Sequence, residues 1–568
     1  MSRLREFRGI EGTDFFEKDQ GLQTLLRDLL TGDDRDEVLS SVHDFAQLVA
    51  GPWDKLAREA SRNENLPRIV KHDRVANPVE QVDFGPHTRQ LRREVAQFGV
   101  LTRTKSDLHK FSLIYYLGHL GEGSVTCGMS CTDGAIRAIE ARGSQFLRDN
   151  YLSKLRSIET PLAGAQFITE QDGGSDVGAI ETAARMNPDG TWYITGEKWF
   201  CSNPDEYFVI AARPEGAPAG TDGIGLFLVP RVLVDGRPNG LSFRRLKDKL
   251  GTRSLPTAEI EFQGATGYAI GEPVEGFKTL MSYVINASRI HNAVNACGFV
   301  HRAFLEARNY ARQREAFGGT LISYPLIQET LVTLLERLWR YRLLTFRLVA
   351  LVDEHGLAPA NPEQAMWQRF LLNLAKYRTA STLTRSIREA ILVFGANGIV
   401  EDFTILPRLL RDALIIETWE GAPNTLCLQI VRDAGRSNLL ERFLAEIESL
   451  LERWPRDFLS LTRAGVTRTL RQVVDLAPEH RLANPEWAQT HAARVVNLLG
   501  DLLEIGWMSE MAVRHANDDA TSAVFTSLAG YHLLQHENPF DHPVLETLSR
   551  TANALIGENP IKIEVADL

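Results

Sequence analysis

The feature of this sequence that most constrains its fold is the spacing of its apolar residues, which changes twice along the chain. Up to about residue 160 the apolar residues recur at intervals of three and four, as in residues 22–30, which predicts helices. From about residue 161 to residue 276 the interval falls to two, as in residues 257–262, which predicts strands. Helical spacing then returns for most of the remainder. The order predicts a mainly α-helical protein with a central β domain.

The two changes of spacing give three segments, and the last one is divided again near residue 433, since a chain of 568 residues exceeds what one core can organise. We expect a helical N-terminal domain (1–160), a β domain (161–276), a helical bundle (277–433) and a helical C-terminal extension (434–568). Residues 62–90, rich in Asn, Pro, Arg and Asp, are predicted to form a loop. The turn residues 187–190, followed by an apolar run, predict a hairpin within the β domain.

Composition excludes several classes of protein. A hydrophobic fraction of 44% with 24% charged residues is typical of a soluble globular protein. The sequence has neither an apolar leader nor a long apolar run, so we expect no membrane span and a cytoplasmic location. Five scattered cysteines without a C-x-x-C pair predict reduced core thiols, and no metal site is predicted. The formal charge of −10 disfavours general nucleic-acid binding, although a local basic patch stays open.

One glutamate lies in a sequence context that suits proton transfer. Glu420 stands between an apolar run and a turn containing Gly421 and Pro423, after which a helical pattern begins. We predict that the run before it is extended. A carboxylate surrounded by apolar residues should have a raised pKa, which suits a base near neutral pH. The alternative is a structural Glu that favours the positive end of the following helix.

Two segments of the β domain suit a large polar ligand. Residues 167–177 combine a strand with a Gly-Gly turn, whose backbone N–H groups can approach a polyoxygenated ligand closely. Residues 196–203 present an aromatic side chain and a hydroxyl together, as needed to cover and hydrogen-bond a flat heteroaromatic ring. Each segment alone could equally be a hairpin with a packed aromatic.

Taken together, these motifs resemble those of the acyl-CoA dehydrogenase family of flavoproteins over nearly all of residues 80–433. Five motifs occur in the family's order: I-T-E-x-x-G-G-S-D (168–176), G-x-K-W-F-x-S-N (196–203), R-E-A-F-G (314–318), F-G-A-N-G (394–398) and W-E-G (419–421). Residues 245–254 and 324–327, the Trp before Glu420, Asn424 and the long extension after Val431 resemble the AidB-like branch. No G-x-G-x-x-G follows a strand, so a Rossmann site is not supported.

The resemblance implies the family's fold, with a helical N-terminal domain, a β-barrel-like middle domain and a helical bundle, here followed by a helical extension. It implies an FAD cofactor and an acyl-CoA substrate. The implied cofactor-binding residues are Ile168, Thr169, Ser175, Phe200, Ser202, Arg314, Phe317, Gly395 and Asn424. The implied substrate-binding residues are Ser175, Arg289 and Gly421. Arg314 and Phe317 would reach the cofactor of a neighbouring subunit, which implies a homo-oligomer (dimer or tetramer), although Arg314 could instead form a surface ion pair.

The implied activity is α,β-dehydrogenation of an acyl-CoA thioester. Glu420 would take the α proton while the β hydrogen leaves as hydride to flavin N5, and an electron-transfer flavoprotein would then accept the electrons. Some relatives carry their base on the helix near Arg289, but no acidic residue occurs from Leu280 to Val300. Two departures from the family pattern, Pro325 and Leu392 in place of Gln, affect the expected contacts to the ADP half of FAD.

Two other functions stay open from the sequence. The first is an AidB-type flavoprotein with a DNA-binding or alkylation-protection role and weak dehydrogenase activity. Residues 434–568 carry 12 Lys and Arg against 19 Asp and Glu, a formal balance of −7 that disfavours DNA. An arginine cluster could still gather on one surface, or be a solvated face: Arg453, Arg456, Arg463, Arg468 and Arg471. The second is a flavin oxidase or monooxygenase, which Glu420 disfavours.

Overall fold

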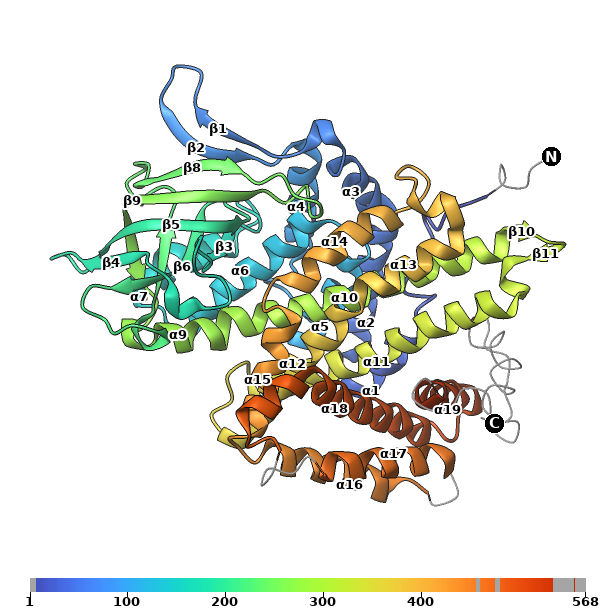
Figure 1. The fold of residues 1–568 in the computed structure, drawn as a ribbon. Coiled ribbons are helices and arrows are strands. Elements are labelled where there is room, and N and C mark those ends of the chain that lie inside the picture. Colours follow the sequence, from blue (N-terminus) through green and yellow to red (C-terminus); the bar gives the residue numbers. More distant parts are fainter. Residues whose placement is uncertain (1–6, 456–459, 476–480, 535–555, 557–568) are drawn as a thin grey trace. The chain divides into compact units, whose positions relative to one another are not determined.

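A computed structural model describes residues 7–455, 460–475, 481–534 and Ile556. The chain forms two compact units (Figure 1). The first unit contains the described residues of segments 1–43, 296–354 and 359–568, and the second contains residues 44–295 and 355–358. Arg456 and the tail from Asn538, apart from Ile556, lie outside the described residues.

The second unit is built around a sheet of seven strands that closes on itself. The strands are β3 (Gly164–Phe167), β4 (Ala183–Met186), β5 (Trp192–Ser202), β6 (Tyr207–Pro214), β7 (Gly225–Pro230), β8 (Leu241–Leu246) and β9 (Thr257–Ala269). Strands β6, β4, β5, β9 and β7 pair in a ring, because β7 pairs back onto β6. Strand β3 joins β6 in parallel, and β8 joins β9 antiparallel. The β-barrel-like domain expected from the sequence is confirmed.

Strand β6 separates two cores of the second unit, because successive side chains along a strand point to opposite faces. Phe208 and Ile210 lie in the barrel interior. Tyr207 and Val209 lie in a second core, which they share with residues of helix α6 (Gly123–Arg142). Burial on both faces explains why this strand reads as a nearly continuous apolar run rather than an alternation.

The hairpin predicted from residues 187–190 is confirmed. Strands β4 and β5 pair antiparallel through Met186 and Trp192. The N–H of Asn187 donates to the carbonyl of Thr191 at 2.8 Å. Gly190 adopts a φ of 83°, the left-handed conformation that glycine tolerates without strain.

Short helices and one further hairpin complete the second unit. The helices are α3 (Asp54–Ala60), α4 (Pro86–Phe98), α5 (Asp107–Gly118), α6, α7 (Gln145–Leu147), α8 (Ser153–Leu155) and α9 (Gly276–Thr279). Helices α2 (Arg35–Leu48) and α10 (Asn286–Gln313) each have residues in both units. A π-helix, η8 (Leu280–Ile285), leads directly into α10.

The prediction of a loop over residues 62–90 is wrong for most of its length. Strands β1 (Arg68–His72) and β2 (Pro78–Asp83) form an antiparallel hairpin, and α4 begins at Pro86. The carboxylate of Asp73 accepts the N–H groups of Val75 and Asn77 and closes the turn. Strand β1 has no buried residue and β2 has only Val82, so the strands lack the apolar alternation by which a strand is recognised.

The first unit is helical except for one short hairpin, β10 (Glu315–Ala316) with β11 (Gly319–Thr320). Its helices are α1 (Gln20–Leu29), α11 (Pro325–His355), α12 (Pro362–Ser381), α13 (Leu383–Phe394), α14 (Leu406–Thr418), α15 (Pro423–Ala434), α16 (Leu439–Arg453), α17 (Ser460–Val474), α18 (Pro485–Arg514) and α19 (Asp519–Leu534). The helical character expected of the C-terminal extension is thus confirmed for its described helices α16 to α19.

All five cysteines are buried and none of them forms a disulfide, as the sequence predicts. Within the described ranges, no helix has both the length and the apolar character that crossing a membrane requires.

Candidate functional site

The two segments that the sequence assigns to a flavin lie side by side in the second unit. The N–H of Trp199 donates to the carbonyl of Thr169 at 2.9 Å. The Nζ of Lys198 donates to the carbonyl of Ile168 at 3.0 Å. Strand β5 shifts register against β9 between Lys198 and Cys201, so the residues between them leave the ladder as at a β-bulge. The end of β3 and the middle of β5 therefore form one surface.

Glu170 anchors the glycine-containing loop that follows β3. Its carboxylate accepts a hydrogen bond from Lys198 Nζ at 2.6 Å and others from the N–H groups of Glu181 and Thr182. Burial alone would raise the pKa of Glu170, but the Lys198 ammonium and these hydrogen bonds outweigh it and lower that pKa. The Glu of the I-T-E motif is thus an ionised structural residue, a role that the sequence analysis did not assign.

The predicted flavin residues of these segments differ in exposure. Ile168 and Thr169 are half-buried at the end of β3, and Ser175 is exposed in the loop. Phe200 is 52% exposed, which is unusual for a phenylalanine on a barrel strand. An exposed aromatic ring beside a half-buried backbone edge is a surface on which a flat ligand can stack.

The hydroxyl of Ser202 is already held within the barrel wall. Its Oγ lies 3.0 Å from Oγ1 of Thr257, its partner in the register of β5 with β9. Lys249 Nζ donates to the same Thr257 Oγ1 at 2.8 Å. A ligand that bonds Ser202 would join an existing chain of hydrogen bonds, which orients the hydroxyl.

Lys247 also belongs to this surface. It lies in the motif segment 245–254, but the sequence indicated no role for it. Its Nζ lies 3.4 Å from the ring centroid of Trp199 and 4.6 Å from that of Phe200. It also forms an ion pair with Glu259 at 2.9 Å. A cation over two aromatic rings holds them in place. The signal available from sequence was its position in the segment 245–254, which carries a dense run of basic residues.

Arg289, predicted to bind substrate, is buried in the first turn of α10. Its neighbour Ser288 accepts a hydrogen bond from Nε2 of Gln166 at 2.9 Å. Gln166 lies on β3, two residues before Ile168. The start of α10 therefore lies against the same strand that carries the predicted flavin residues.

Glu420 lies in the turn between two helices of the first unit, α14 and α15. The expectation that an extended segment precedes it is wrong. Leu409, Ala413 and Ile416 are buried at helical spacings of four and three, so α14 continues to Thr418. The short apolar run before Glu420 was compatible with either structure, since a brief apolar run does not separate a strand from a buried helix.

The backbone of this turn is constrained at Glu420 itself. Glu420 has a φ of 57° and Gly421 a φ of 106°. A positive φ is costly for a glutamate and persists where the surrounding structure enforces it, as at many active sites. Lys376, fully buried, donates to the carbonyls of Glu417 at 3.1 Å and Gly421 at 2.8 Å, and so holds both sides of the turn. The Glu420 side chain is half-buried.

The indole of Trp419, next to Glu420, carries an unused donor. Its Nε1 is buried, and it has no hydrogen-bond partner among the described residues. Buried polar atoms are nearly always paired in folded proteins, so an unpaired donor here indicates a position where a ligand atom can complete the bond.

The other predicted cofactor residues of the first unit lie at its surface. Arg314 follows α10 and is half-buried, and Phe317 stands at the tip of the β10–β11 hairpin, 95% exposed. The ring of Phe317 meets only the edge of Tyr324, with centroids 6.4 Å apart. Gly395 ends α13 with a φ of 61°, and Asn424 is exposed at the start of α15.

Two arginines of the cluster considered for DNA binding already have hydrogen-bond or ion-pair partners within the first unit. Arg453 pairs with Glu510 at 3.0 Å. Arg463 donates to the carbonyls of Leu451 and Trp454 at the end of α16. Arg456 lies outside the described residues. These bonds favour a structural role for the arginines rather than a phosphate-binding surface.

Two groups in the described chain have the spacing of metal ligands: Asp14, Glu17 and His43, and Asp501, Glu504 and His532. In the second group, Arg378 donates to Asp501 and to Glu504, so the positive charge of its guanidinium already balances the carboxylates that a metal ion would need. In the first, His43 Nε2 lies 2.6 Å from Asp14. The absence of a metal stays a prediction.

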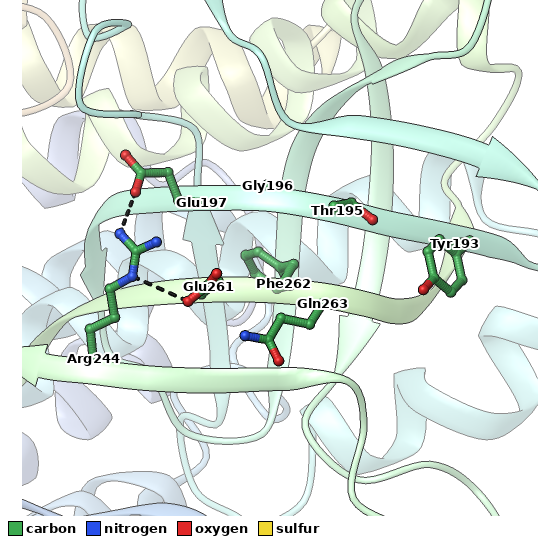
Figure 2. Close-up of a pocket in the computed structure, with 8 residues that line it drawn as sticks. All are labelled: Tyr193, Thr195, Gly196, Glu197, Arg244, Glu261, Phe262 and Gln263. Carbon is green, nitrogen blue, oxygen red and sulfur yellow. Dashed lines mark hydrogen bonds and ion pairs between the residues drawn. The ribbon is translucent and has the colours of Figure 1, made fainter.

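Figure 2 shows a hollow of about 470 Å³ in the barrel wall, formed by residues of β5, β8 and β9. None of the residues predicted to bind cofactor or substrate lines it. Arg244 in this hollow pairs with Glu197 and, at 3.4 Å, with Glu261. Because its one guanidinium is shared between two carboxylates, the hollow offers no net positive charge to a phosphorylated cofactor.

Comparison with known proteins places these features in a family. The middle-domain model of acyl-CoA dehydrogenases matches residues 165–265, and the C-terminal-domain model matches residues 274–435. The chain is 30% identical to acyl-CoA dehydrogenase family member 11 of Caenorhabditis elegans, over 81% of this chain and 78% of that protein. It is 35% identical to the putative acyl-CoA dehydrogenase AidB of Escherichia coli, over 50% of this chain and 51% of that protein.

The fold agrees over a longer stretch. The structure of ACDH-11 of Caenorhabditis elegans in complex with C11-CoA superposes with a TM-score of 0.82 at 26% identity, covering 96% of each chain. The order of the motifs, the closed β barrel and this extent of similarity lead to one conclusion: the chain belongs to the acyl-CoA dehydrogenase family.

Proposed function

We propose that this protein is an FAD-dependent dehydrogenase of acyl-CoA thioesters. The observation that carries the proposal is the joining of the two predicted flavin segments by the hydrogen bonds from Trp199 to Thr169 and from Lys198 to Ile168. These segments are separate in the sequence, at residues 168–176 and 196–203, yet they form one surface with an exposed aromatic ring. The segment boundaries at residues 160, 276 and 433 remain part of the proposal, supported by the family matches to 165–265 and 274–435.

The residues present fit a flavin. Phe200 would cover the ring, and the Ile168 and Thr169 backbone with the Ser202 hydroxyl would meet its polar edge. The surface offers an aromatic face, a hydroxyl and backbone groups, and the charge of Lys247 beside them is paired with Glu259. This chemistry suits an isoalloxazine ring better than a bare phosphate. When bound, FAD would supply the acceptor for the hydride that leaves the substrate's β carbon. An electron-transfer flavoprotein remains the proposed partner that takes up the electrons.

Glu420 is the proposed base that removes the α proton. The turn held by Lys376 fixes its backbone in the left-handed region, and a base needs fixed position more than mobility. The N–H of Glu420 would hold the thioester oxygen, on which negative charge develops as the proton leaves. Gly421 has no side chain to obstruct the approach of the thioester to this turn.

The test compares Glu420→Gln with the wild-type protein. The variant should be as yellow as the wild type, but its flavin absorbance should not bleach with an acyl-CoA, a loss of at least about 100-fold in rate, because general bases contribute about that much or more. Glu401→Gln, on an exposed residue of the same unit, is the matched control and should bleach normally. If Glu420→Gln is fully active, Glu420 is not the base that removes the α proton.

The acceptor can be settled in the same preparation. Reduction of an artificial electron acceptor without stoichiometric hydrogen peroxide supports a dehydrogenase, and stoichiometric peroxide would support the oxidase alternative. An AidB-type role in DNA protection is not favoured, because Arg453 and Arg463 have partners within their own unit. We also propose a homo-oligomer, supported by the exposed Phe317. The cytoplasmic location expected from the sequence stays a prediction.

A further inference from the structure

Three neutral polar side chains from distant parts of the sequence meet in the second unit. Ser130 lies on α6, Gln166 on β3 and Ser288 on α10. The Oγ of Ser288 accepts from Gln166 Nε2 at 2.9 Å and from Ser130 Oγ at 3.2 Å. Gln166 Oε1 also lies 3.2 Å from the same Oγ. Ser288 is buried, whereas Ser130 and Gln166 are half-buried and so reach an accessible edge.

The cluster lies on the face of β3 that carries the predicted flavin residue Ile168. Ala165 and Phe167 point into the barrel core, so Gln166 and Ile168 point to the opposite face. Ile168, Tyr283 and Ile285 are partly buried and pack against the same apolar core. A wall that combines partly exposed apolar side chains with a polar cluster suits a ligand that is mostly apolar and carries one polar group.

The backbone around the cluster has features found at binding sites. Ser288 follows the π-helix η8, and such π-helical turns are frequently functional. Gly134 lies one turn after Ser130 on α6, and a Cβ placed on it would stand 3.5 Å from Gln166 Oε1, an ordinary contact distance. The space beside the amide of Gln166 is therefore large enough for a methyl-sized group.

The charged groups around Asp133 balance one another, so they do not require a charged ligand. Asp133 on α6 accepts from Lys110 at 2.9 Å, from Arg137 at 3.1 Å and from His291 Nε2 at 3.0 Å. With Asp107, which also pairs with Lys110, the two carboxylates balance the two cations. Burial lowers the pKa of His291, which keeps its ring neutral despite the Asp133 carboxylate.

One further polar atom extends the cluster along α10. His291 is buried one turn after Ser288, and its Nδ1 has no hydrogen-bond partner among the described residues. The two hydroxyls and the amide can donate or accept, whereas Nδ1 of the neutral His291 ring can only accept, because Nε2 carries the proton given to Asp133. Together they complement an uncharged oxygen, either a hydroxyl or a carbonyl.

We propose that Ser130, Gln166 and Ser288 bind a hydroxyl or carbonyl oxygen carried on the acyl chain of the substrate. The inference rests on the proposed acyl-CoA dehydrogenase function and narrows its substrate class to acyl groups that carry a polar substituent. No acidic residue occurs from Leu280 to Val300, so the cluster recognises substrate without serving as a second base.

The test uses the purified holoenzyme with a straight-chain acyl-CoA and with acyl-CoAs of equal length that carry a hydroxyl or a keto group at successive carbons beyond the β carbon. At one position or more, the substituted substrate should have a kcat/KM about 10-fold higher or more, because a site built to hydrogen-bond an oxygen rejects the analogue that lacks it. Gln166→Leu should abolish this preference, because kcat/KM for the substituted substrate should fall by about 10-fold more than kcat/KM for the straight chain.

Two other variants separate recognition from folding. Gly134→Ala fills the space beside Gln166 with a methyl group and favours the helix, so it should fold and still lose the preference. Gln145→Leu changes an exposed glutamine of α7 and should retain the preference for the substituted acyl-CoA. The inference is overturned if no substituted acyl-CoA is preferred, or if Gln166→Leu slows both substrates equally. If no acyl-CoA reduces the flavin, the proposed function fails as well.

Discussion

The ammonium group of Lys198 lies in the interior of the second unit, where its side chain is fully buried. It donates to the carbonyl of Ile168 and to the carboxylate of Glu170, and so ties the loop after β3 to strand β5. A buried ion pair stabilises little in itself, but removal of one partner leaves an uncompensated charge. The geometry of the proposed flavin surface therefore depends on a residue that need not touch the flavin.

Lys198→Met should lower the free energy of unfolding by about 3–5 kcal/mol, the range for breaking a buried ion pair. It should also reduce the flavin content of the purified protein, because the Ile168 carbonyl loses its donor. Urea unfolding and the flavin-to-protein absorbance ratio measure the two effects. Adding Glu170→Gln should recover part of the stability, since it removes the unpaired charge. If Lys198→Met alone is as stable as the wild type and contains as much flavin, the proposed role of Lys198 is wrong.

At the scale of elements, the helices of the C-terminal extension are joined to the bundle by buried charges. Glu504 on α18 is fully buried and accepts from Arg340 on α11 at 2.6 Å and from Arg378 on α12 at 2.9 Å. His532 on α19 lies 2.9 Å from Glu336 on α11 and 3.3 Å from Asp501 on α18. Such a network fixes how four helices dock, because each charge is satisfied only in one arrangement.

This network predicts that docking of α19 depends on pH. Burial and Arg340 lower the pKa of His532, but the carboxylates of Glu336 and Asp501 outweigh them and raise it above its ordinary value. A raised pKa in the folded state means that the stabilisation is complete below the unfolded value of about 6.5 and is lost as pH rises through the folded value. The wild-type urea midpoint should therefore fall between about pH 6 and about pH 9.

His532→Gln is the matched variant, because glutamine keeps hydrogen-bonding capacity without titrating. It should be less stable than the wild type at the acidic end and should lack most of the fall in midpoint. If the two proteins lose stability in parallel as pH rises, the effect comes from other groups and the role of His532 is wrong.

At the scale of the whole molecule, Glu420 belongs to the first unit and the proposed flavin surface to the second. The first unit also exposes large apolar side chains: Phe317, Leu326, Leu392 and Ile399. The resemblance that implied a homo-oligomer assigned Phe317 to the cofactor of a neighbouring subunit.

Phe317→Asp should therefore yield a smaller assembly than the wild type, because a carboxylate cannot be buried without a partner. Sedimentation velocity or light scattering after size-exclusion chromatography measures the mass. Val274→Asp is the matched control, because Val274 is 82% exposed in the second unit and should tolerate the change. A monomeric wild type, or equal masses for the wild type and Phe317→Asp, would contradict the proposal.

Local patterns in the sequence were sufficient for much of the fold. The turn residues Asn187 to Gly190 determine the β4–β5 hairpin, because the required backbone conformation depends on neighbouring residues alone. The motif order pointed to the family, and the turn at Glu420 was correctly located even though the segment before it is helical. The hairpin of β1 and β2 was missed, because Val82 is the one buried residue of its two strands and a single buried position gives no apolar alternation.

Only the tertiary structure decided which distant residues meet. Lys198 and Glu170 are 28 residues apart, and Ser130 and Ser288 are 158 residues apart. No periodicity links such positions, because side chains on different elements are paired by how the elements pack. The sequence by itself determined the elements, the family motifs and a glutamate in a tight turn. Packing decided that a buried lysine ties the loop after β3 to strand β5 and that neutral polar groups from α6, β3 and α10 cluster together, since hydrogen bonds and ion pairs depend on distances of a few ångströms.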